Sequence, residues 1–166
     1  MPEDRVQRRL AAILAADVVG YSRLMGEDEE ATLATLKACR GILDGLIAQH
    51  GGRVFGTAGD SVIAEFASPV EAVRCATEIQ LALNKHNTDL PGPGRMRLRI
   101  GINLGDVVVD GNNLMGDGVN VAARLEALAP PGGICVSETI QMQVRDRLSL
   151  DFLDLGEHKE IGRAHV

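Results

Sequence analysis

The sequence predicts an α+β fold in which helices cover one face of a mainly antiparallel sheet. A near-continuous aliphatic run at residues 10–19 is typical of a central strand buried on both faces. One stretch from Glu29 to Gly51 and another that follows Pro69 carry apolar residues at helical spacing. Gly-rich turns between β-prone segments complete the pattern, which predicts the order strand, helix, hairpin, helix, hairpin, helix.

Glycine, proline and serine set the borders of the first predicted elements. The first long helix ends at the pair of glycines 51–52. Residues 53–55 and 62–66 flank a Gly-rich turn, which predicts a hairpin with Asp60 near its tip. Ser68 and Glu71 have the capping-box spacing, with proline at the first helical position, so the second long helix begins there.

The second half of the chain continues this alternation. Residues 96–103 alternate between apolar and polar side chains, as a half-buried strand does. Residues 105–109 predict a second hairpin, which leads through the loop 110–113 to a helix that carries Asn120 and Arg124. Three more elements are expected after that helix: a short strand at 134–136, a short helix capped by Ser137 and a terminal strand at 152–155.

Length and composition restrict the class of protein. The 166 residues fit a single domain over 1–166, with residues 1–8 expected as a flexible N-terminal segment and the C-terminus expected to be cut from a longer protein. The formal net charge of −6 argues against a nucleic-acid surface. With three Phe, one Tyr and no Trp, the chain lacks the aromatic platforms on which bases stack. We therefore expect an aliphatic core and no nucleic-acid partner.

The cysteines indicate a reducing compartment. Cys39, Cys75 and Cys135 are odd in number and lie in apolar surroundings, which predicts buried thiols and a cytoplasmic protein. The longest apolar run is too short to span a bilayer, so no membrane segment is expected in this chain. The histidines show no metal-ligand spacing and are expected on the surface or in loops: His50, His86, His158 and His165.

Two carboxylates stand at the ends of buried-looking segments. Asp17 closes the first aliphatic run, and Asp60 lies in the first hairpin turn. Burial of an unpaired carboxylate is costly, so a pair that converges there would suit Mg²⁺ bound together with substrate phosphates. Taken singly, Asp17 also fits a turn cap and Asp60 an Asx-turn.

A second polar pair lies in the helix that follows the loop 110–113. Asn120 and Arg124 are four residues apart and therefore share one helix face. An amide beside a guanidinium favours a phosphorylated ligand, because the guanidinium fork matches phosphate geometry. The alternative is a surface arginine near a capping asparagine.

Four motifs in order, at 16–22, 57–61 with 64–66, 99–105 and 116–124, resemble those of the class III nucleotidyl cyclases, the adenylate and guanylate cyclase catalytic domains. The resemblance covers nearly all of the chain and implies the ferredoxin-like βαββαβ core of that family. It also implies an enzyme that forms a 3′,5′-cyclic nucleotide and pyrophosphate from a nucleoside triphosphate.

The resemblance assigns the metal and phosphate sites. Asp17 and Asp60, with the backbone carbonyl of Val18, would hold two divalent ions, Mg²⁺ or Mn²⁺. Arg99 on the central strand is expected to contact the triphosphate. The backbone amides expected to cradle phosphate oxygens belong to Val19, Gly20, Tyr21 and Ser22.

The resemblance also assigns the transition-state helix and the assembly. Asn120 would orient the ribose, and Arg124 would neutralise charge that develops on the α-phosphate. In this family the metal aspartates and the Asn/Arg pair of one site come from different subunits. A head-to-tail homodimer with shared active sites is therefore expected.

The chain departs from the family at the positions that read the base. Gly56 stands where adenylate cyclases usually have Lys, and Asn113 stands where they have Asp or Thr. Neither residue enforces adenine over guanine. The last edge strand and its Lys-Gly pair are missing or altered, with Lys159 or Arg163 as substitutes for the phosphate-binding Lys. We expect an adenylate cyclase; the alternatives are a guanylate cyclase and a cyclase-like nucleotide-binding or dimerisation module without turnover.

Overall fold

The computed structural model describes residues 7–90, 95–154 and 161–165, and for 56–58 and the residues from 151 onward it describes the backbone only. The strands are β1 (Gln7–Val18), β2 (Arg53–Ala58), β3 (Ser61–Phe66), β4 (Leu98–Asp110), β5 (Asn113–Met115), β6 (Ile134–Ser137), β7 (Asp151–Asp154) and β8 (Ile161–His165). The helices are α1 (Tyr21–Glu27), α2 (Glu29–Gln49), α3 (Pro69–Thr88), α4 (Asp117–Leu128) and α5 (Glu138–Val144).

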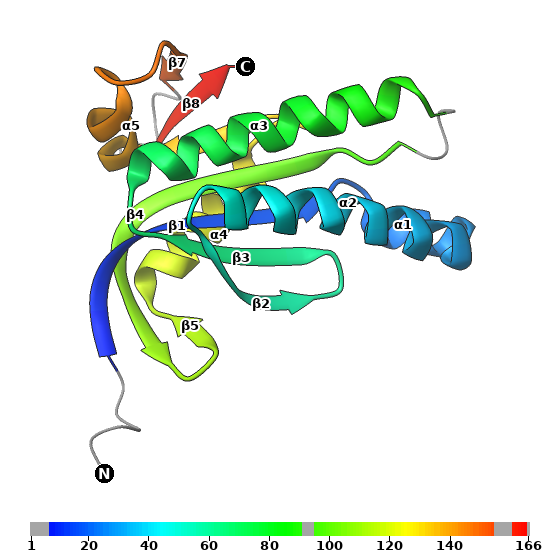
Figure 1. The fold of residues 1–166 in the computed structure, drawn as a ribbon, viewed down its shortest axis with the longest axis horizontal. Coiled ribbons are helices and arrows are strands. Elements are labelled where there is room, and N and C mark those ends of the chain that lie inside the picture. The colour runs from blue at the N-terminus through cyan, green and yellow to red at the C-terminus, as the bar shows by residue number, and fades with distance from the viewer. Residues whose placement is uncertain (1–6, 91–94, 155–160, 166) are drawn as a thin grey trace.

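The strands form one sheet in the order β2-β3-β1-β4-β6-β8-β7, with β5 paired to β4 (Figure 1). Only β4 and β6 run parallel among the described pairs; the other neighbours are antiparallel. The two long central strands, β1 and β4, pair along the whole length of β1. The α+β class and the mainly antiparallel sheet are thus confirmed.

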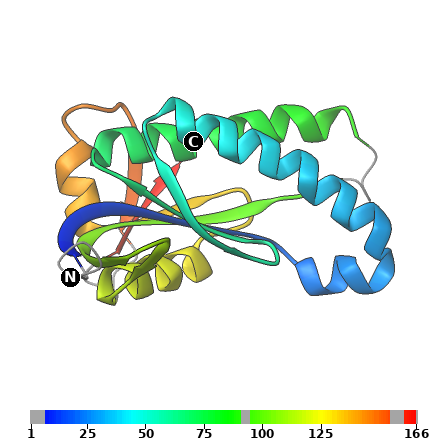
Figure 2. The ribbon, with the colours of Figure 1, turned by 60° about the horizontal axis from the view of Figure 1, so that its bottom comes forward.

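Helices cover both faces of the sheet, which corrects the expectation that they cover one. Helices α2 and α3 lie on one face and α4 on the other (Figure 2). Successive residues of β1 supply both cores: Leu14 packs in the cluster beneath α2 and α3, and Ile13 packs in the cluster with Ala122 of α4. Because β1 is apolar on both sides, each face needs a cover.

The turn of the second hairpin lies further along the chain than predicted. Strand β4 continues through Gly105 and Asp106, which pair with Ala11 and Leu10 of β1. The chain turns instead after Asp110, which pairs with Asn113 at the start of β5. The glycine at 105 indicated a turn locally, but the length of β1 provides a partner that keeps β4 extended.

Both ends of the chain also differ from expectation. Residues 1–6 lie outside the described residues, and Gln7 and Arg8 of the expected flexible segment belong to β1. The last strand was expected to be missing or altered; it is not missing, since β8 lies between β6 and β7 and pairs with both, inside the sheet and not at its edge. Arg163 is in β8, and Lys159 lies outside the described residues. No helix in the described ranges has both the length and the apolar character needed to cross a membrane.

Local signals set the helix starts as expected. The Ser68 hydroxyl accepts a hydrogen bond from the Glu71 amide at 3.2 Å, and Ser137 accepts one from the Ile140 amide at 3.3 Å. Helix α1 was not predicted, because none of its seven residues is fully buried and so short a segment shows no clear apolar periodicity. The prediction of buried cysteines is confirmed for all three: Cys39, Cys75 and Cys135.

Helix α4 rests directly on β4 through glycine contacts. A Cβ at Gly101 would clash with backbone atoms of Ala122 and Glu126, and one at Gly118 would lie 2.6 Å from the carbonyl oxygen of Asp106. The buried side chain of Asn103 donates to the Gly118 carbonyl at 3.1 Å. These contacts set the short distance between α4 and the sheet.

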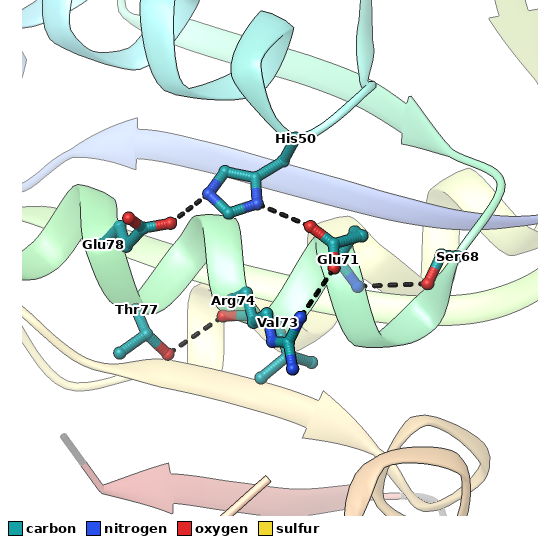
Figure 3. A network of polar contacts seen from close by, with 7 residues as sticks. All are labelled: His50, Ser68, Glu71, Val73, Arg74, Thr77 and Glu78. Atoms are coloured by element: carbon teal, nitrogen blue, oxygen red, sulfur yellow. Dashed lines mark hydrogen bonds and ion pairs between the residues drawn. The ribbon is translucent and has the colours of Figure 1, made fainter. Parts of the chain in front are cut away.

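Helices α2 and α3 are joined by a polar network (Figure 3). His50, at the end of α2, places Nδ1 2.8 Å from Oε1 of Glu71 and Nε2 against the carboxylate of Glu78. Burial lowers the pKa of His50, but the hydrogen bonds and charges of the two glutamates outweigh it and raise the pKa. Hydrogen bonding to His50 lowers the pKa of Glu71. His50 is therefore an interhelical contact, contrary to the expectation of an ordinary surface or loop residue.

We expect the Gly101→Ala substitution to destabilise the protein by about 1–3 kcal/mol, because overpacking against the α4 backbone forces the helix away from β4. The matched control is Gly45→Ala on the exposed side of α2, where a Cβ meets nothing within 4 Å. Replacement of a helical glycine there should raise the free energy of unfolding by about 0.5–1 kcal/mol. Urea unfolding measures both, and equal effects would contradict the close approach of α4.

The His50 network should make stability depend on pH. The pKa of His50 is higher in the folded protein than in the unfolded chain. Protonated His50 therefore stabilises the fold fully at a pH below its unfolded-state pKa, and this stabilisation is lost as the pH rises through its folded-state pKa. The loss in unfolding free energy caused by His50→Gln should therefore be larger at about pH 6 than at about pH 9. His86→Gln is the control, since His86 makes no ion pair with any described residue. If His50→Gln lowers the free energy of unfolding by the same amount at both pH values, protonation of His50 does not stabilise the fold.

Candidate active site

Two carboxylates meet at the end of β1. Asp17 is the penultimate residue of β1, and Asp60 lies in the turn that joins β2 to β3, the neighbour of β1. Oδ2 of Asp60 accepts a hydrogen bond of 2.8 Å from the backbone amide of Val18. The charge of Asp60 raises the pKa of Asp17, as expected for carboxylates close together. The structure therefore brings the two predicted metal residues to one place.

A third carboxylate, Glu126 of α4, reaches the same place. Its side chain is hydrogen-bonded to that of Asp17. Burial, together with the nearby charge of Asp17, raises the pKa of Glu126 to about 7. Burial is also the main cause that raises the pKa of Asp17, and the hydrogen bond from Glu126 opposes it. Glu126 was not among the residues predicted from the sequence, because a glutamate within a helix has the pattern of a solvated residue until the helix is placed on the sheet.

Arg99 borders these carboxylates. It stands opposite Asp17 in the β1–β4 register, and its charge lowers the pKa values of both Asp17 and Glu126. Its Nε donates to the carbonyl oxygen of Ala129 at 3.0 Å, just beyond the end of α4. The expected contact of Arg99 with a triphosphate remains a prediction, but the residue lies in the site.

The loop after β1 offers fewer backbone donors than expected. The amide of Val19 donates to the carbonyl of Arg97 at 2.9 Å, so the expectation that it binds phosphate is corrected. Gly20 adopts a left-handed conformation (φ 67°) and precedes α1. The amides of Tyr21 and Ser22 belong to the first turn of α1, where helical amides have no intrahelical acceptor. Gly20, Tyr21 and Ser22 remain the candidate phosphate cradle.

The second polar pair lies on the opposite side of α4 from the carboxylates. Asn120 and Arg124 are both exposed, on one helix face. Glu126 is two residues beyond Arg124, which in an α-helix corresponds to roughly 200° of rotation. Because Glu126 faces Asp17, Arg124 points away from it. Within one copy of the chain, the metal residues and the Asn/Arg pair do not meet.

The expected base-reading positions lie on neighbouring elements. Gly56 is in β2, next to an irregularity in the pairing with β3, and Asn113 is exposed at the start of β5. Strands β2 and β5 are in contact. Phe55 and Leu114 pack against the same apolar cluster as Val119 of α4. The two strands that carry these positions therefore lie side by side, near α4.

The donor set suits a hard divalent cation. The two carboxylates and the Val18 carbonyl are oxygen donors, the ligand type that Mg²⁺ and Mn²⁺ prefer. In the described part of the chain, no group of three or more His, Cys, Asp or Glu side chains is arranged as a complete ligand set. A cation here would thus depend on additional oxygens, which phosphates supply. Burial first, and the charges of the neighbouring carboxylates after it, raise the pKa of both Asp17 and Glu126.

A cavity of about 740 Å³ lies nearby, between α1, α2 and the segment before β4, with Val19, Leu24 and Arg97 in its lining. Neither Asp17 nor Asp60 lines it.

Comparisons with known proteins identify the family to which the chain belongs. Residues 6–164 match the family model described as the adenylate and guanylate cyclase catalytic domain. "Putative adenylate cyclase 3" of Rhizobium meliloti is 51% identical over 160 residues, which cover 96% of this chain and 27% of that protein. "Adenylate cyclase" of Streptomyces coelicolor is 36% identical over 138 residues, 81% of this chain and 34% of that protein.

A solved structure has the same fold as this chain. The adenylate/guanylate cyclase/hydrolase of Silicibacter pomeroyi superimposes with a TM-score of 0.87 at 45% identity, covering 96% of each chain. The present chain covers 27% and 34% of the two curated relatives above, so it corresponds to one part of each. The matched family model, these identities and the shared fold establish that the chain belongs to the adenylate and guanylate cyclase catalytic domains, the class III nucleotidyl cyclases.

Proposed function

We propose that the chain is the catalytic domain of an adenylate cyclase that converts ATP to 3′,5′-cyclic AMP and pyrophosphate. The observation that carries this proposal is the hydrogen bond from the Val18 amide to Asp60, which holds a second carboxylate beside Asp17. The names of the two curated relatives above favour ATP as substrate. GTP is the second candidate, because Gly56 has no side chain and Asn113 can both donate and accept.

The residues of the site have separate tasks in this reaction. Asp17, Asp60 and the Val18 carbonyl would hold two Mg²⁺ or Mn²⁺ ions, which favour loss of the ribose 3′-proton and neutralise the triphosphate. The amides of the loop after β1 and the guanidinium of Arg99 bind phosphate oxygens. These interactions align the α-phosphate for attack by the 3′-oxygen.

Asn120 and Arg124 act on the other side of the substrate. The Asn120 amide orients the ribose. Arg124 neutralises the charge that grows on the α-phosphate as the new P–O bond forms and pyrophosphate leaves. Removal of one such donor typically slows a reaction by about 10²–10³-fold.

Two copies of the chain complete each site. Because Arg124 points away from Asp17 in its own copy, a head-to-tail pair allows each copy to lend Asn120 and Arg124 to the carboxylates of the other. Buried cysteines suit the reducing cytoplasm as the place where the dimer works.

With Mn²⁺ and ATP, the purified protein should form cyclic AMP, and Asp17→Asn should reduce the rate by about 10³-fold or more because several kcal/mol of charge stabilisation are lost. Asp44→Asn, on an exposed part of α2, is the control and should keep the native rate. The ratio of kcat/KM for ATP and GTP decides the base. No cyclic product from either nucleotide at high protein concentration would reject the proposed activity.

Mixing two inactive variants tests the shared site. Asp17→Asn and Arg124→Ala should each be inactive alone, whereas an equal mixture should regain about a quarter of native activity, because half of the randomly formed dimers carry one intact site of two. A mixture of Asp17→Asn with Asp60→Asn is the matched control, since both changes damage the same half of the site. Failure of the first mixture to recover, under conditions where native dimers exchange copies, would contradict the head-to-tail arrangement.

A further inference from the structure

A cavity beside the candidate phosphate cradle (residues 20–22) is lined by three arginines to which the proposed reaction assigns no task. The cavity has a volume of about 740 Å³ between α1, α2 and the segment before β4, and Arg23, Arg95 and Arg97 belong to its lining. This volume is within the range of small-molecule sites. Val19, the residue before the cradle, also lines the cavity, so the cavity and the cradle share a border.

Arg97 lies on the same side of the chain as Arg99, the residue expected to contact the triphosphate. The buried Met96 and Leu98 alternate with exposed arginines, so the side-chain alternation of β4 extends back through this segment. The backbone carbonyl of Arg97 accepts the 2.9 Å hydrogen bond from the Val19 amide, which holds the base of the Arg97 side chain beside the loop. A row of arginines therefore leads from the carboxylates to the cavity.

Arg23 of α1 also borders the cradle. Its guanidinium lies over Gly20, since a Cβ built on that glycine would be 3.4 Å from Nη2 of Arg23. Nη1 of Arg23 is 3.3 Å from Oε1 of Glu27, and both side chains of this ion pair are more than half exposed. Such an exposed pair contributes little to stability, so Arg23 can exchange Glu27 for a phosphate oxygen.

The lining carries an excess of positive charge, although the formal net charge of the whole chain is −6. The three arginines are accompanied by two acids, Glu27 and Asp28. Asp28 is engaged as the cap of α2, where its Oδ1 accepts a hydrogen bond of 3.1 Å from the Ala31 amide. The side chain of Arg97 makes no hydrogen bond or ion pair with any residue in the described ranges. The lining therefore suits an anion with several oxygens, because guanidinium groups bind phosphate through paired hydrogen bonds.

We propose that Arg23 and Arg97 bind the terminal phosphates of the nucleoside triphosphate in this cavity and hold the pyrophosphate until it is released. This inference rests on the proposed function, because it takes the substrate phosphates to lie on the cradle. It adds two side chains to the residues that the family resemblance assigns. Both act on the phosphates that leave and not on the α-phosphate, so they contribute to binding of substrate and product more than to the chemical step.

Binding of inorganic pyrophosphate with Mn²⁺ tests this without any need for turnover, by calorimetric titration of the 166-residue protein. We expect Arg23→Met and Arg97→Met each to weaken pyrophosphate binding by about tenfold, the usual effect of losing one charge-assisted hydrogen bond. Glu27→Gln should tighten it by about two- to threefold, because it removes the competitor for Arg23. Arg145→Met makes the same chemical change at the exposed C-terminal end of α5 and should bind as the native protein does.

Steady-state rates of cyclic AMP formation provide a second measurement. Arg97→Met should raise KM for ATP by about tenfold and leave kcat within about threefold of the native value, because the interaction is equal in the bound substrate and in the transition state. Added salt should reduce the difference between the native protein and Arg97→Met, since charges at an exposed site are screened. Circular dichroism checks the folding of each variant, and Arg97→Gln replaces Arg97→Met if the latter does not fold.

The outcomes separate this inference from the proposed function. If both arginine variants bind pyrophosphate and ATP as the native protein does, the cavity is not a phosphate site, and cyclic AMP formation by the same variants leaves the proposed function intact. If orthophosphate binds to protein already saturated with a non-hydrolysable ATP analogue, and Arg97→Met abolishes that binding, the cavity takes a free anion and its assignment to the substrate phosphates is wrong. If the native protein forms no cyclic product but its pyrophosphate binding depends on Arg97, the proposed function fails and the pyrophosphate site remains.

Discussion

The hydrogen bond between the Val18 amide and Asp60 is the constraint on which the site depends. It ties the turn after β2 to the end of β1, so that a carboxylate in a turn is held beside one in a strand. Two carboxylates in one partly buried place repel each other, and the raised pKa of Asp17 records burial first and this repulsion as a further cause. A divalent cation bound between the two carboxylates, as proposed, would relieve this repulsion.

The second constraint is the contact of α4 with the sheet. Glycines 101 and 118 bring the helix backbone against β4, and Asn103 secures it. This packing fixes which face of α4 is buried. Glu126 then meets Asp17, and Arg124 is left exposed on the far side. In the proposed enzyme the residues of one catalytic centre would therefore come together only when two copies combine, and packing within one copy is what leaves Arg124 available to the other.

Much of this could be predicted from local patterns, because capping serines, the first hairpin and the apolar β1 run each act over a few residues. Strand β4 could not, since Gly105 indicates a turn and only pairing with β1 keeps it extended. Among site residues, Asp17 and Asp60 were found from the cost of burying charge. Val19 was misjudged because its amide partner, Arg97, is remote in sequence. Glu126 was missed because a glutamate within a helix resembles a solvated residue until the helix is placed on the sheet.

The central claim is that Asp17 and Asp60 together bind divalent cations. A crystal structure of the protein with Mn²⁺ and a non-hydrolysable ATP analogue, with anomalous scattering used to locate manganese, tests it most directly. We expect anomalous density in contact with both carboxylates and the triphosphate, with Asn120 and Arg124 of a second copy facing the same nucleotide. Manganese bound elsewhere, or nucleotide bound with no metal beside these two carboxylates, would contradict it.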